Sequence, residues 1–276
     1  MSQIICIYHA ECMDGASAAA VVRYKYPQAK LIPAKHGDPV PQGLEKAKVF
    51  IVDFSYSPTL LKKIQGVAQE VHWFDHHKTA IPFQKEVGFG IVDLNESGAT
   101  LTWKQLFPKK KVPKILQYVR DKDLWLWKLP HSREISADLR EVQNIFDPTK
   151  PVWKKLLHGQ TSKQWKEMIE RGKHSRCILR QRLEKAAKRG FLAFLNGTQV
   201  FAVNWSEDSS DLGEMIYQEL KHPVAAIFSY NGEGWTFSLR SNSVDVSKIA
   251  VHYGGGGHPG AAGFRTPNIE WLFSKV

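Results

Sequence analysis

The chain has 276 residues, of which 43% are hydrophobic, and it carries a formal net charge of +11 at pH 7. This length is enough for two modest domains, each with a hydrophobic core of its own. Three cysteines without paired spacing exclude a disulfide framework and a zinc knuckle. No run of about 18 apolar residues could span a bilayer, and no N-terminal segment is typical of a signal peptide. We therefore expect a cytoplasmic protein that does not enter a membrane.

The first half of the chain alternates short apolar runs with helical stretches, which is typical of a parallel sheet flanked by helices. Strands are predicted at residues 3–8, 29–34, 48–53, 70–74 and 89–93. Helices are predicted near residues 14–26, 57–67, 97–107 and 112–128.

Polar residues stand where three of these predicted strands end. His9 and Asp14 follow the first strand, Asp53 ends another, and the tripeptide Asp75–His77 ends the next. Because open α/β sheets place ligands at the carboxyl ends of their strands, we expect these side chains to converge. Carboxylates gathered that closely repel one another, and a cation is the usual remedy. Oxygen and nitrogen donors suit Mn, Mg, Fe or Zn. Taken alone, the tripeptide could also be a pair of surface histidines that closes a strand.

The second half predicts a long helix followed by a small α/β domain. Residues 161–189 lack strand alternation and predict the helix. Twelve Lys and Arg against three Glu lie between residues 154 and 189, so a basic stripe could follow phosphates. A solvated helix is the alternative. The domain after it is predicted to contain strands at 191–195, 199–204, 224–230 and 235–240, with helices at 210–220 and 244–253.

A glycine-rich run near the C-terminus is predicted to bind an anion. Residues 254–264 read Gly-Gly-Gly-Gly-His-Pro-Gly-Ala-Ala-Gly-Phe. Successive glycines let a backbone approach a ligand closely and aim N–H groups at it. His258 could donate a hydrogen bond to a phosphate or protonate a leaving oxygen.

Five segments thus stand in order along the chain: His9 with Asp14, then Asp53, the tripeptide, the helical run 118–125 and the glycine run. In this order and spacing they resemble the DHH phosphoesterases that carry the type 1 DHH-associated C-terminal domain. That group includes RecJ-like exonucleases, oligoribonucleases and cyclic-dinucleotide phosphodiesterases. The resemblance covers nearly the whole chain.

The resemblance implies two divalent ions, Mn²⁺ or Mg²⁺, that together activate a water molecule. Asp53 would bridge both ions, because its two carboxylate oxygens can face different cations. His9 and Asp14 would hold the first ion. His76 and Asp121 would hold the second.

The remaining motif residues are implied to support these ligands or to contact substrate. Asp75 is expected to orient an imidazole or to act as a weak ligand, and His77 to contact the scissile phosphate. A catalytic role is therefore implied for Asp53, His76, His77 and His258. Substrate-binding residues are expected to be His77, Arg240, Ser241, Gly255, Gly256, Gly257 and His258.

The first motif departs from the family pattern. Many members have a histidine, three residues, an aspartate, one residue and a second aspartate. Here His9 is followed by four residues and then by Asp14 alone. Glu11 or Cys12 is left to fill the missing place, although Cys12 could equally be a packing residue.

The fourth motif offers two candidates, Asp121 and Asp123. Two residues that stand two apart on a helix cannot both point the same way. We expect Asp121 to be the ligand and Asp123 to be a cap or a nearby anion.

The resemblance implies hydrolysis of phosphodiester bonds in short oligonucleotides or single-stranded nucleic acid. A cyclic-dinucleotide phosphodiesterase or a small nucleotide phosphatase would share the catalytic residues, and the altered first motif admits a non-catalytic nucleic-acid-binding protein. The expected fold is α/β throughout. A parallel-sheet DHH domain at 1–153, a basic linker helix at 154–190 and a smaller α/β substrate-binding domain at 191–276 would form it, with the active cleft between the domains.

Overall fold

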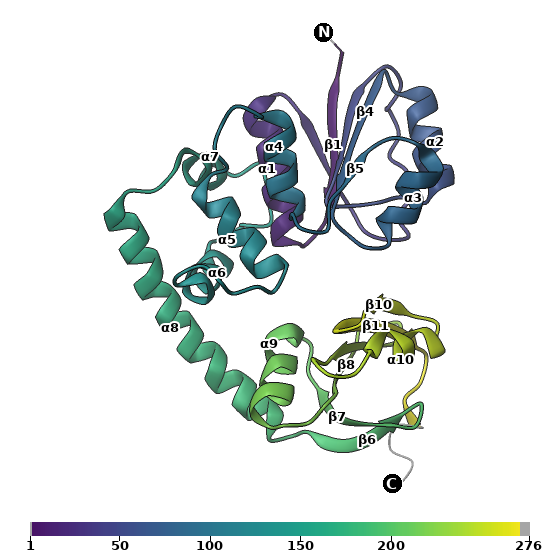
Figure 1. Ribbon diagram of the computed structural model, residues 1–276, viewed down its shortest axis with the longest axis vertical. Helices are drawn as coiled ribbons and strands as arrows, with labels where there is room; N and C mark the ends of the chain where they lie inside the picture. Colours follow the sequence, from purple (N-terminus) through teal and green to yellow (C-terminus); the bar gives the residue numbers. More distant parts are fainter. Residues whose placement is uncertain (1, 271–276) are drawn as a thin grey trace. The chain divides into compact units, whose positions relative to one another are not determined.

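The computed structural model describes residues 2–270, and these form two compact units (Figure 1). The first unit extends to Arg176 and the second begins at Cys177, so the boundary lies within helix α8 (Ser162–Ala187). Among the described residues, no helix is both long and apolar enough to cross a membrane. The separate linker domain predicted at 154–190 stays a prediction.

The first unit contains the predicted parallel sheet. Its five strands run in the order β2-β1-β3-β4-β5, and every neighbouring pair is parallel. The last strand is only two residues long, shorter than the predicted 89–93. The strands are β1 (Ile4–His9), β2 (Lys30–Ala34), β3 (Lys48–Val52), β4 (Glu70–Asp75) and β5 (Ile91–Val92).

Helices cover both faces of this sheet, which is why its strands are apolar on both sides. Helices α1 (Met13–Lys25) and α4 (Gly98–Leu106) lie on one face, where they pack on Cys6 and Phe50. Helices α2 (Pro58–Val67) and α3 (Ala80–Val87) lie on the other face, where Ile5, Ile51 and Trp73 are buried (Figure 1). Alternate residues of one strand thus enter different cores.

Three short helices of the first unit, α3, α6 and α7, were not predicted. They are amphipathic segments of eight to ten residues, too short to give a strong periodic signal. The predicted helix at 112–128 was too long, because the chain turns after Asp123. The helices after α4 are α5 (Lys114–Asp123), α6 (Ser132–Glu141), α7 (Pro151–His158) and α8.

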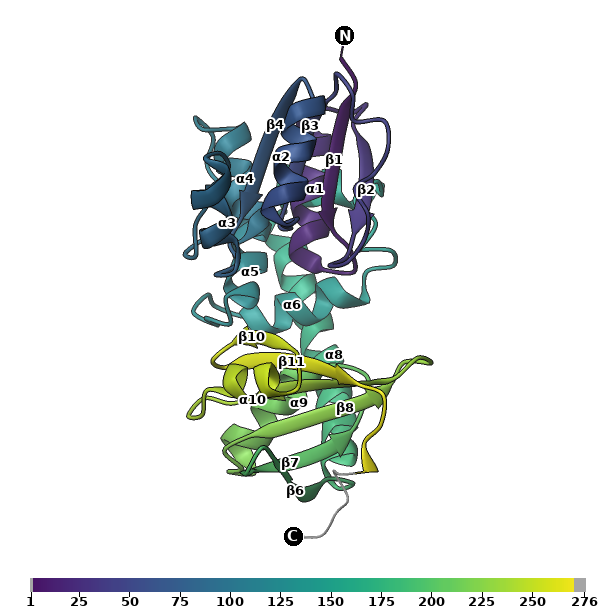
Figure 2. The ribbon, with the colours of Figure 1, turned by 90° about the vertical axis from the view of Figure 1, so that its right-hand side faces the viewer.

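The second unit contains a mixed six-stranded sheet in the order β10-β11-β9-β8-β7-β6 (Figure 2). Only β7 and β8 pair in parallel. Helix α10 (Val246–His252) packs on one face, and α9 (Ser209–Glu214) with the π-helix η1 (Met215–Glu219) packs on the other. The strands are β6 (Phe191–Leu195), β7 (Thr198–Asn204), β8 (Ala225–Tyr230), β9 (Trp235–Arg240), β10 (Gly256–His258) and β11 (Ala261–Thr266).

Part of the predicted glycine loop is a strand. Gly256–His258 forms β10 and pairs with β11 in an antiparallel hairpin. A Cβ at Gly255 would lie 2.1 Å from the Gly263 carbonyl oxygen, and a Cβ at Gly257 would lie 2.5 Å from the Ala262 Cα. The glycines therefore allow two segments of the protein backbone to approach each other closely. The sequence predicted instead that they allow the backbone to approach a ligand.

Gly172 permits a similar close approach between α8 and α6. A Cβ there would lie 1.9 Å from the Glu134 carbonyl oxygen. We expect Gly172→Ala to lower the free energy of unfolding by about 1–3 kcal/mol, because rigid backbone must move. Urea unfolding followed by circular dichroism measures this change.

The matched control is Gly66→Ala in α2, where no atom lies within 4 Å of the new methyl group. Alanine is favoured over glycine inside helices by about 0.5–1 kcal/mol, so this variant should be neutral or slightly more stable. Equal losses in both variants would contradict the close approach of α8 to α6.

Candidate metal centre

Three parallel strands bring polar residues to one edge of the sheet. Tyr8 of β1 pairs with Val52 of β3, and Val52 pairs with Phe74 of β4. The residues that come next, His9, Asp53 and Asp75, therefore lie side by side at the carboxyl ends of the strands, as the sequence predicted.

Asp53 lies at the centre of this edge. Its backbone has φ of 55°, a left-handed conformation that is uncommon outside glycine, and its N–H donates to the Phe74 carbonyl. The side chain is 1% exposed, with Oδ1 3.1 Å from His76 Nε2 and Oδ2 3.6 Å from His9 Nδ1. Oδ2 is buried without a hydrogen-bond partner. Burial opposes charge on this carboxylate, yet the hydrogen bond from His76 and the nearby imidazole of His9 hold the pKa of Asp53 below its usual value.

Asp14 enters the same group from the first turn of α1. Its oxygens accept the backbone N–H groups of Gly98 and Ala99, the first residues of α4. These N–H groups have no partner within their own helix, and the positive end of the helix dipole favours a carboxylate. Burial and the charges of Asp53 and Asp123 nevertheless raise the pKa of Asp14 well above its usual value.

One imidazole nitrogen faces three carboxylates. His76 Nε2 lies 3.1 Å from Asp53 Oδ1, 3.3 Å from Asp123 Oδ2 and 3.7 Å from Asp14 Oδ2. Burial lowers the pKa of His76, but the hydrogen bond to Asp53 and the charges of Asp14 and Asp123 outweigh it, and the pKa rises to about 10. The group thus requires positive charge. A proton on His76 supplies one unit, and a divalent ion would supply two.

Asp75 holds the two histidines in place. Its Oδ1 accepts the backbone N–H groups of His76 and His77 at 2.7 and 3.1 Å, and lies 2.6 Å from His77 Nδ1. Its Oδ2 accepts the Ser55 hydroxyl. These contacts occupy both carboxylate oxygens of Asp75, and the one to Nδ1 fixes the His77 ring, so Asp75 is placed to orient His77. The other ring nitrogen of His77, whose side chain is 33% exposed, is left for a ligand.

The structure places Asp123, and not Asp121, in the group. Asp121 is buried, and its oxygens accept the N–H groups of Lys128 and Leu129, which fixes the turn after α5. Asp123 Oδ2 faces His76 and has no hydrogen-bond partner. The sequence could not separate the two aspartates, because the choice depends on a turn that contains two left-handed tryptophans, Trp125 and Trp127.

The described residues contain three sets of metal-binding side chains whose ligand atoms lie within 4.8 Å of one another. Asp53 belongs to two of them and His76 to two. Together with the unpartnered oxygens of Asp53 and Asp123, this arrangement fits divalent cations held by oxygen and nitrogen donors. The sets are His9–Cys12–Asp53, Asp53–His76–His77 and Asp14–His76–Asp123.

The predicted substrate residues of the second unit differ in their surroundings. Arg240 is half-buried at the end of β9, with its guanidinium 3.1 Å from the Ser210 hydroxyl. Ser241 is buried, donates to the Pro223 carbonyl and accepts the N–H groups of Ser243 and Val244. Its hydroxyl thus closes a turn. Gly256, Gly257 and His258 are exposed, and Gly255 is half-buried.

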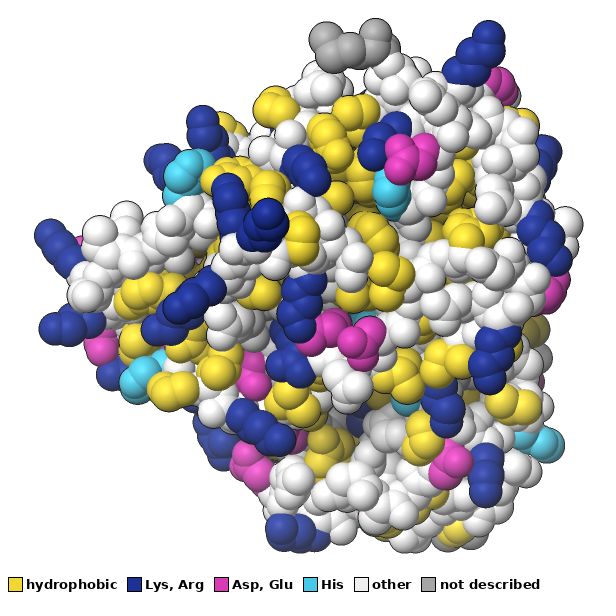
Figure 3. All heavy atoms as spheres, turned by 45° about the horizontal axis from the view of Figure 1, so that its top comes forward, with side chains coloured by type: hydrophobic (Ala, Val, Ile, Leu, Met, Phe, Trp, Pro, Cys, Tyr) yellow, Lys and Arg dark blue, Asp and Glu magenta, His cyan; other side chains and the backbone are white. Residues whose placement is uncertain are grey.

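The basic helix α8 carries less uncompensated charge than its sequence suggests. Most of its cations lie beside carboxylates, and Figure 3 shows Lys and Arg spread over one face of the molecule with Asp and Glu among them. Asp138, the partner of Arg171, is buried, whereas the pairs whose two partners are both exposed contribute about 0–1 kcal/mol each. The stripe is therefore a weak reason to expect a polyanion. The pairs include Arg171–Asp138, Arg176–Glu134, Arg180–Glu219 and Arg182–Glu207.

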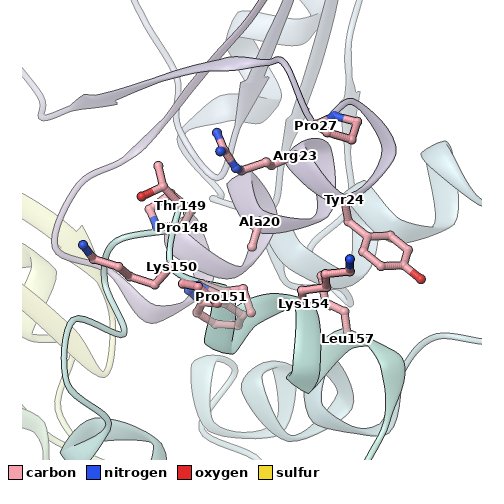
Figure 4. Close-up of a pocket in the computed structure, with 11 residues that line it drawn as sticks. Ala20, Arg23, Tyr24, Pro27, Pro148, Thr149, Lys150, Pro151, Lys154 and Leu157 are labelled. Atoms are coloured by element: carbon pink, nitrogen blue, oxygen red, sulfur yellow. The ribbon is translucent and has the colours of Figure 1, made fainter.

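A separate cavity of about 440 Å³ lies between α1 and α7 (Figure 4). Three cations, Arg23, Lys150 and Lys154, line it with Tyr24 and several prolines. Its lining contains no carboxylate, imidazole or thiol, so it cannot be the metal centre.

Comparison with known proteins finds one domain match and two relatives. The family model of the DHHA1 domain matches residues 197–273. The oligoribonuclease NrnB of Bacillus subtilis is 24% identical over 80% of this chain, which spans 61% of that protein. The matched DHHA1 segment lies in the second unit. Protein R106 of Acanthamoeba polyphaga mimivirus, which is uncharacterized, is 28% identical over 99% of this chain and 70% of its own length.

Two solved structures resemble nearly the whole chain. The pGpG-specific phosphodiesterase PggH from Vibrio cholerae has a TM-score of 0.55 at 14% identity, covering 96% of this chain and 94% of that one. An exopolyphosphatase-related protein from Bacteroides fragilis has a TM-score of 0.54 at 11% identity, covering 97% and 88%. At this identity the likeness establishes the fold alone.

Two neighbouring aspartates test the arrangement. In metal-free protein, Asp123→Asn should raise the melting temperature, because it removes one of three mutually repelling carboxylates. The stabilisation gained on adding Mn²⁺ should shrink, by about 1.4 kcal/mol for each tenfold loss of affinity. Thermal melts with chelator and with Mn²⁺ measure both effects.

Asp121→Asn is the matched variant two residues away. It weakens charge-assisted hydrogen bonds to Lys128 and Leu129, so it should cost about 1–3 kcal/mol with or without metal. If instead Asp121→Asn reduced the metal response and Asp123→Asn did not, Asp121 would be the ligand.

Proposed function

We propose that this protein is a divalent-metal-dependent phosphodiesterase that hydrolyses short oligonucleotides or single-stranded nucleic acid. The observation that carries the proposal is the convergence of buried carboxylates and imidazoles at one sheet edge, where Asp53 Oδ2 and Asp123 Oδ2 lack hydrogen-bond partners. Similarity to an oligoribonuclease supports this choice of substrate.

We assign two ion positions that share Asp53, because its Oδ2 lies 3.6 Å from His9 Nδ1 and its Oδ1 lies 3.1 Å from His76 Nε2. His9 contributes to the first position. His76, Asp14 and Asp123 contribute to the second, so Asp14 moves from the predicted first position and Asp123 replaces the predicted Asp121. When bound, Mn²⁺ or Mg²⁺ supplies a nucleophilic water at neutral pH and polarises the phosphoryl oxygen.

The other residues in the group hold and contact the substrate. Asp75 fixes the ring of His77 through Nδ1, so that the second nitrogen can donate to the scissile phosphate. Burial lowers the pKa of His77 and the Asp75 hydrogen bond raises it, with a net rise that favours the donating form. Contacts to the rest of the substrate are assigned to Arg240 and to the segment Gly255–His258 of the second unit. Ser241 would support Arg240 through the turn that it closes.

A linear or cyclic dinucleotide is the second candidate substrate. The likeness to a pGpG-specific phosphodiesterase extends over nearly the whole chain, and the same ligand set would serve either substrate. A phosphatase acting on a small nucleotide and a non-catalytic nucleic-acid-binding protein remain as outcomes of the same assay.

The test is incubation with 5′-labelled RNA and DNA, from dinucleotides to long strands, with Mn²⁺, Mg²⁺ or chelator. Progressive shortening that requires metal supports the nuclease. Intact strands with cleavage of dinucleotides alone would support the second candidate. Binding with a steep salt dependence and no cleavage under any metal would overturn both.

We expect Asp53→Ala to reduce turnover by more than about 100-fold, because the loss of a ligand exceeds the effect of losing a residue that only orients one. Steady-state rates with Mn²⁺ measure this loss. Glu86→Ala, which removes an exposed carboxylate from α3, is the control and should retain full activity. Normal turnover by Asp53→Ala would contradict the shared-ligand assignment.

A further inference from the structure

The altered first motif leaves one ion position short of a carboxylate, and two residues could fill it. Glu11 is excluded as a ligand because its side chain points away from the ion position. Its side chain is 77% exposed and forms an ion pair with Lys35 at 2.8 Å, in a left-handed backbone conformation that turns it outward. Cys12 is therefore the remaining candidate.

Cys12 is placed at the ion position itself. Its sulfur, a His9 nitrogen and an Asp53 oxygen lie within 4.8 Å of one another. Asp53 is 1% exposed, and the oxygen that lies 3.6 Å from His9 has no hydrogen-bond partner. A buried carboxylate oxygen is thus left without a partner beside the thiol, which is the arrangement that a cation would satisfy.

A packing role for Cys12 has little support. Cys12 belongs to none of the hydrophobic clusters among the described residues, whereas Cys6 is buried in the core beneath α1. Cys12 instead occupies the residue before the first turn of α1.

We propose that Cys12 is a thiolate ligand of the first ion, together with His9 and Asp53. Thiolate and imidazole donors select transition metals such as Zn²⁺, Co²⁺ and Fe²⁺, whereas Mg²⁺ requires oxygen donors. The thiol proton passes to solvent as the sulfur binds the ion. The second position, with two carboxylates and one imidazole, keeps its preference for a harder ion such as Mn²⁺. The inference rests on the proposed function only in that both require a metal at this edge.

Titration of the full-length, metal-free protein with Co²⁺ tests the inference. A Co²⁺–thiolate bond gives a charge-transfer band in the near ultraviolet, while weaker visible bands report Co²⁺ bound by any ligand. The wild-type protein should develop both sets of bands. Cys12→Ser should lose the near-ultraviolet band, and its Co²⁺ affinity should fall about 10–100-fold.

Two further variants keep the test decisive. Cys177→Ser, which removes an exposed thiol, should retain the band. Cys12→Asp restores a carboxylate and should shift metal preference from Zn²⁺ toward Mn²⁺ and Mg²⁺, even where Cys12→Ser fails to fold. Visible bands without a near-ultraviolet band in the wild type, no Co²⁺ binding, or a band that survives in Cys12→Ser would each overturn the inference.

The Co²⁺ spectra test the thiolate ligand and the turnover assay tests the proposed function, so either can fail without the other. A Cys12-dependent band in a protein that cleaves no phosphodiester would sustain the thiolate ligand and refute the proposed function. Metal-dependent cleavage without the band would do the reverse.

Discussion

Mutual repulsion among three carboxylates, the buried Asp14 and Asp53 and the partly buried Asp123, is the constraint on which the rest of the first unit depends. Asp14, Asp53 and Asp123 all lie within 3.7 Å of one imidazole nitrogen of His76. Removing such charges from water is costly unless each gains a charged or hydrogen-bonded partner. The protein provides the start of α4 for Asp14 and the histidines for Asp53. Two oxygens, Asp53 Oδ2 and Asp123 Oδ2, remain without a hydrogen-bond partner, and a cation could satisfy both.

Glycine sets how closely the helices can approach this group. A Cβ at Gly98 would lie 2.5 Å from the Asp53 Cβ, and a Cβ at Gly15 would lie 2.2 Å from the His9 carbonyl oxygen. Any side chain at either position would push α4 or α1 away from the sheet edge. The backbone N–H groups of α4 would then no longer reach Asp14. Glycines outside the recognised glycine run are therefore as important to the metal centre as its ligands.

The parallel sheet and most of the site could be predicted because both depend on strand order. Apolar runs that end in His9, Asp53 and Asp75 must bring those residues to one edge once the strands are parallel. The site predictions that were wrong, or that left two alternatives, depend on the conformation of turns. Asp123 rather than Asp121 faces His76 because the chain leaves α5 through residues in the left-handed backbone conformation. Residues with bulky side chains rarely adopt this conformation. Backbone conformation at such positions is set by tertiary contacts that no local pattern records.

The ligands of the candidate centre all come from residues 9–123, so the first unit can assemble it from its own side chains. The fold also occurs in a pGpG-specific phosphodiesterase and in an exopolyphosphatase-related protein. A shared fold does not fix the substrate. In the proposed phosphodiesterase, selection among phosphoesters would therefore depend on groups outside the ligand set, and residues 197–273 match the DHHA1 domain. On the proposed roles, a change such as cysteine for carboxylate at position 12 would alter which ion is bound without altering which substrate is recognised.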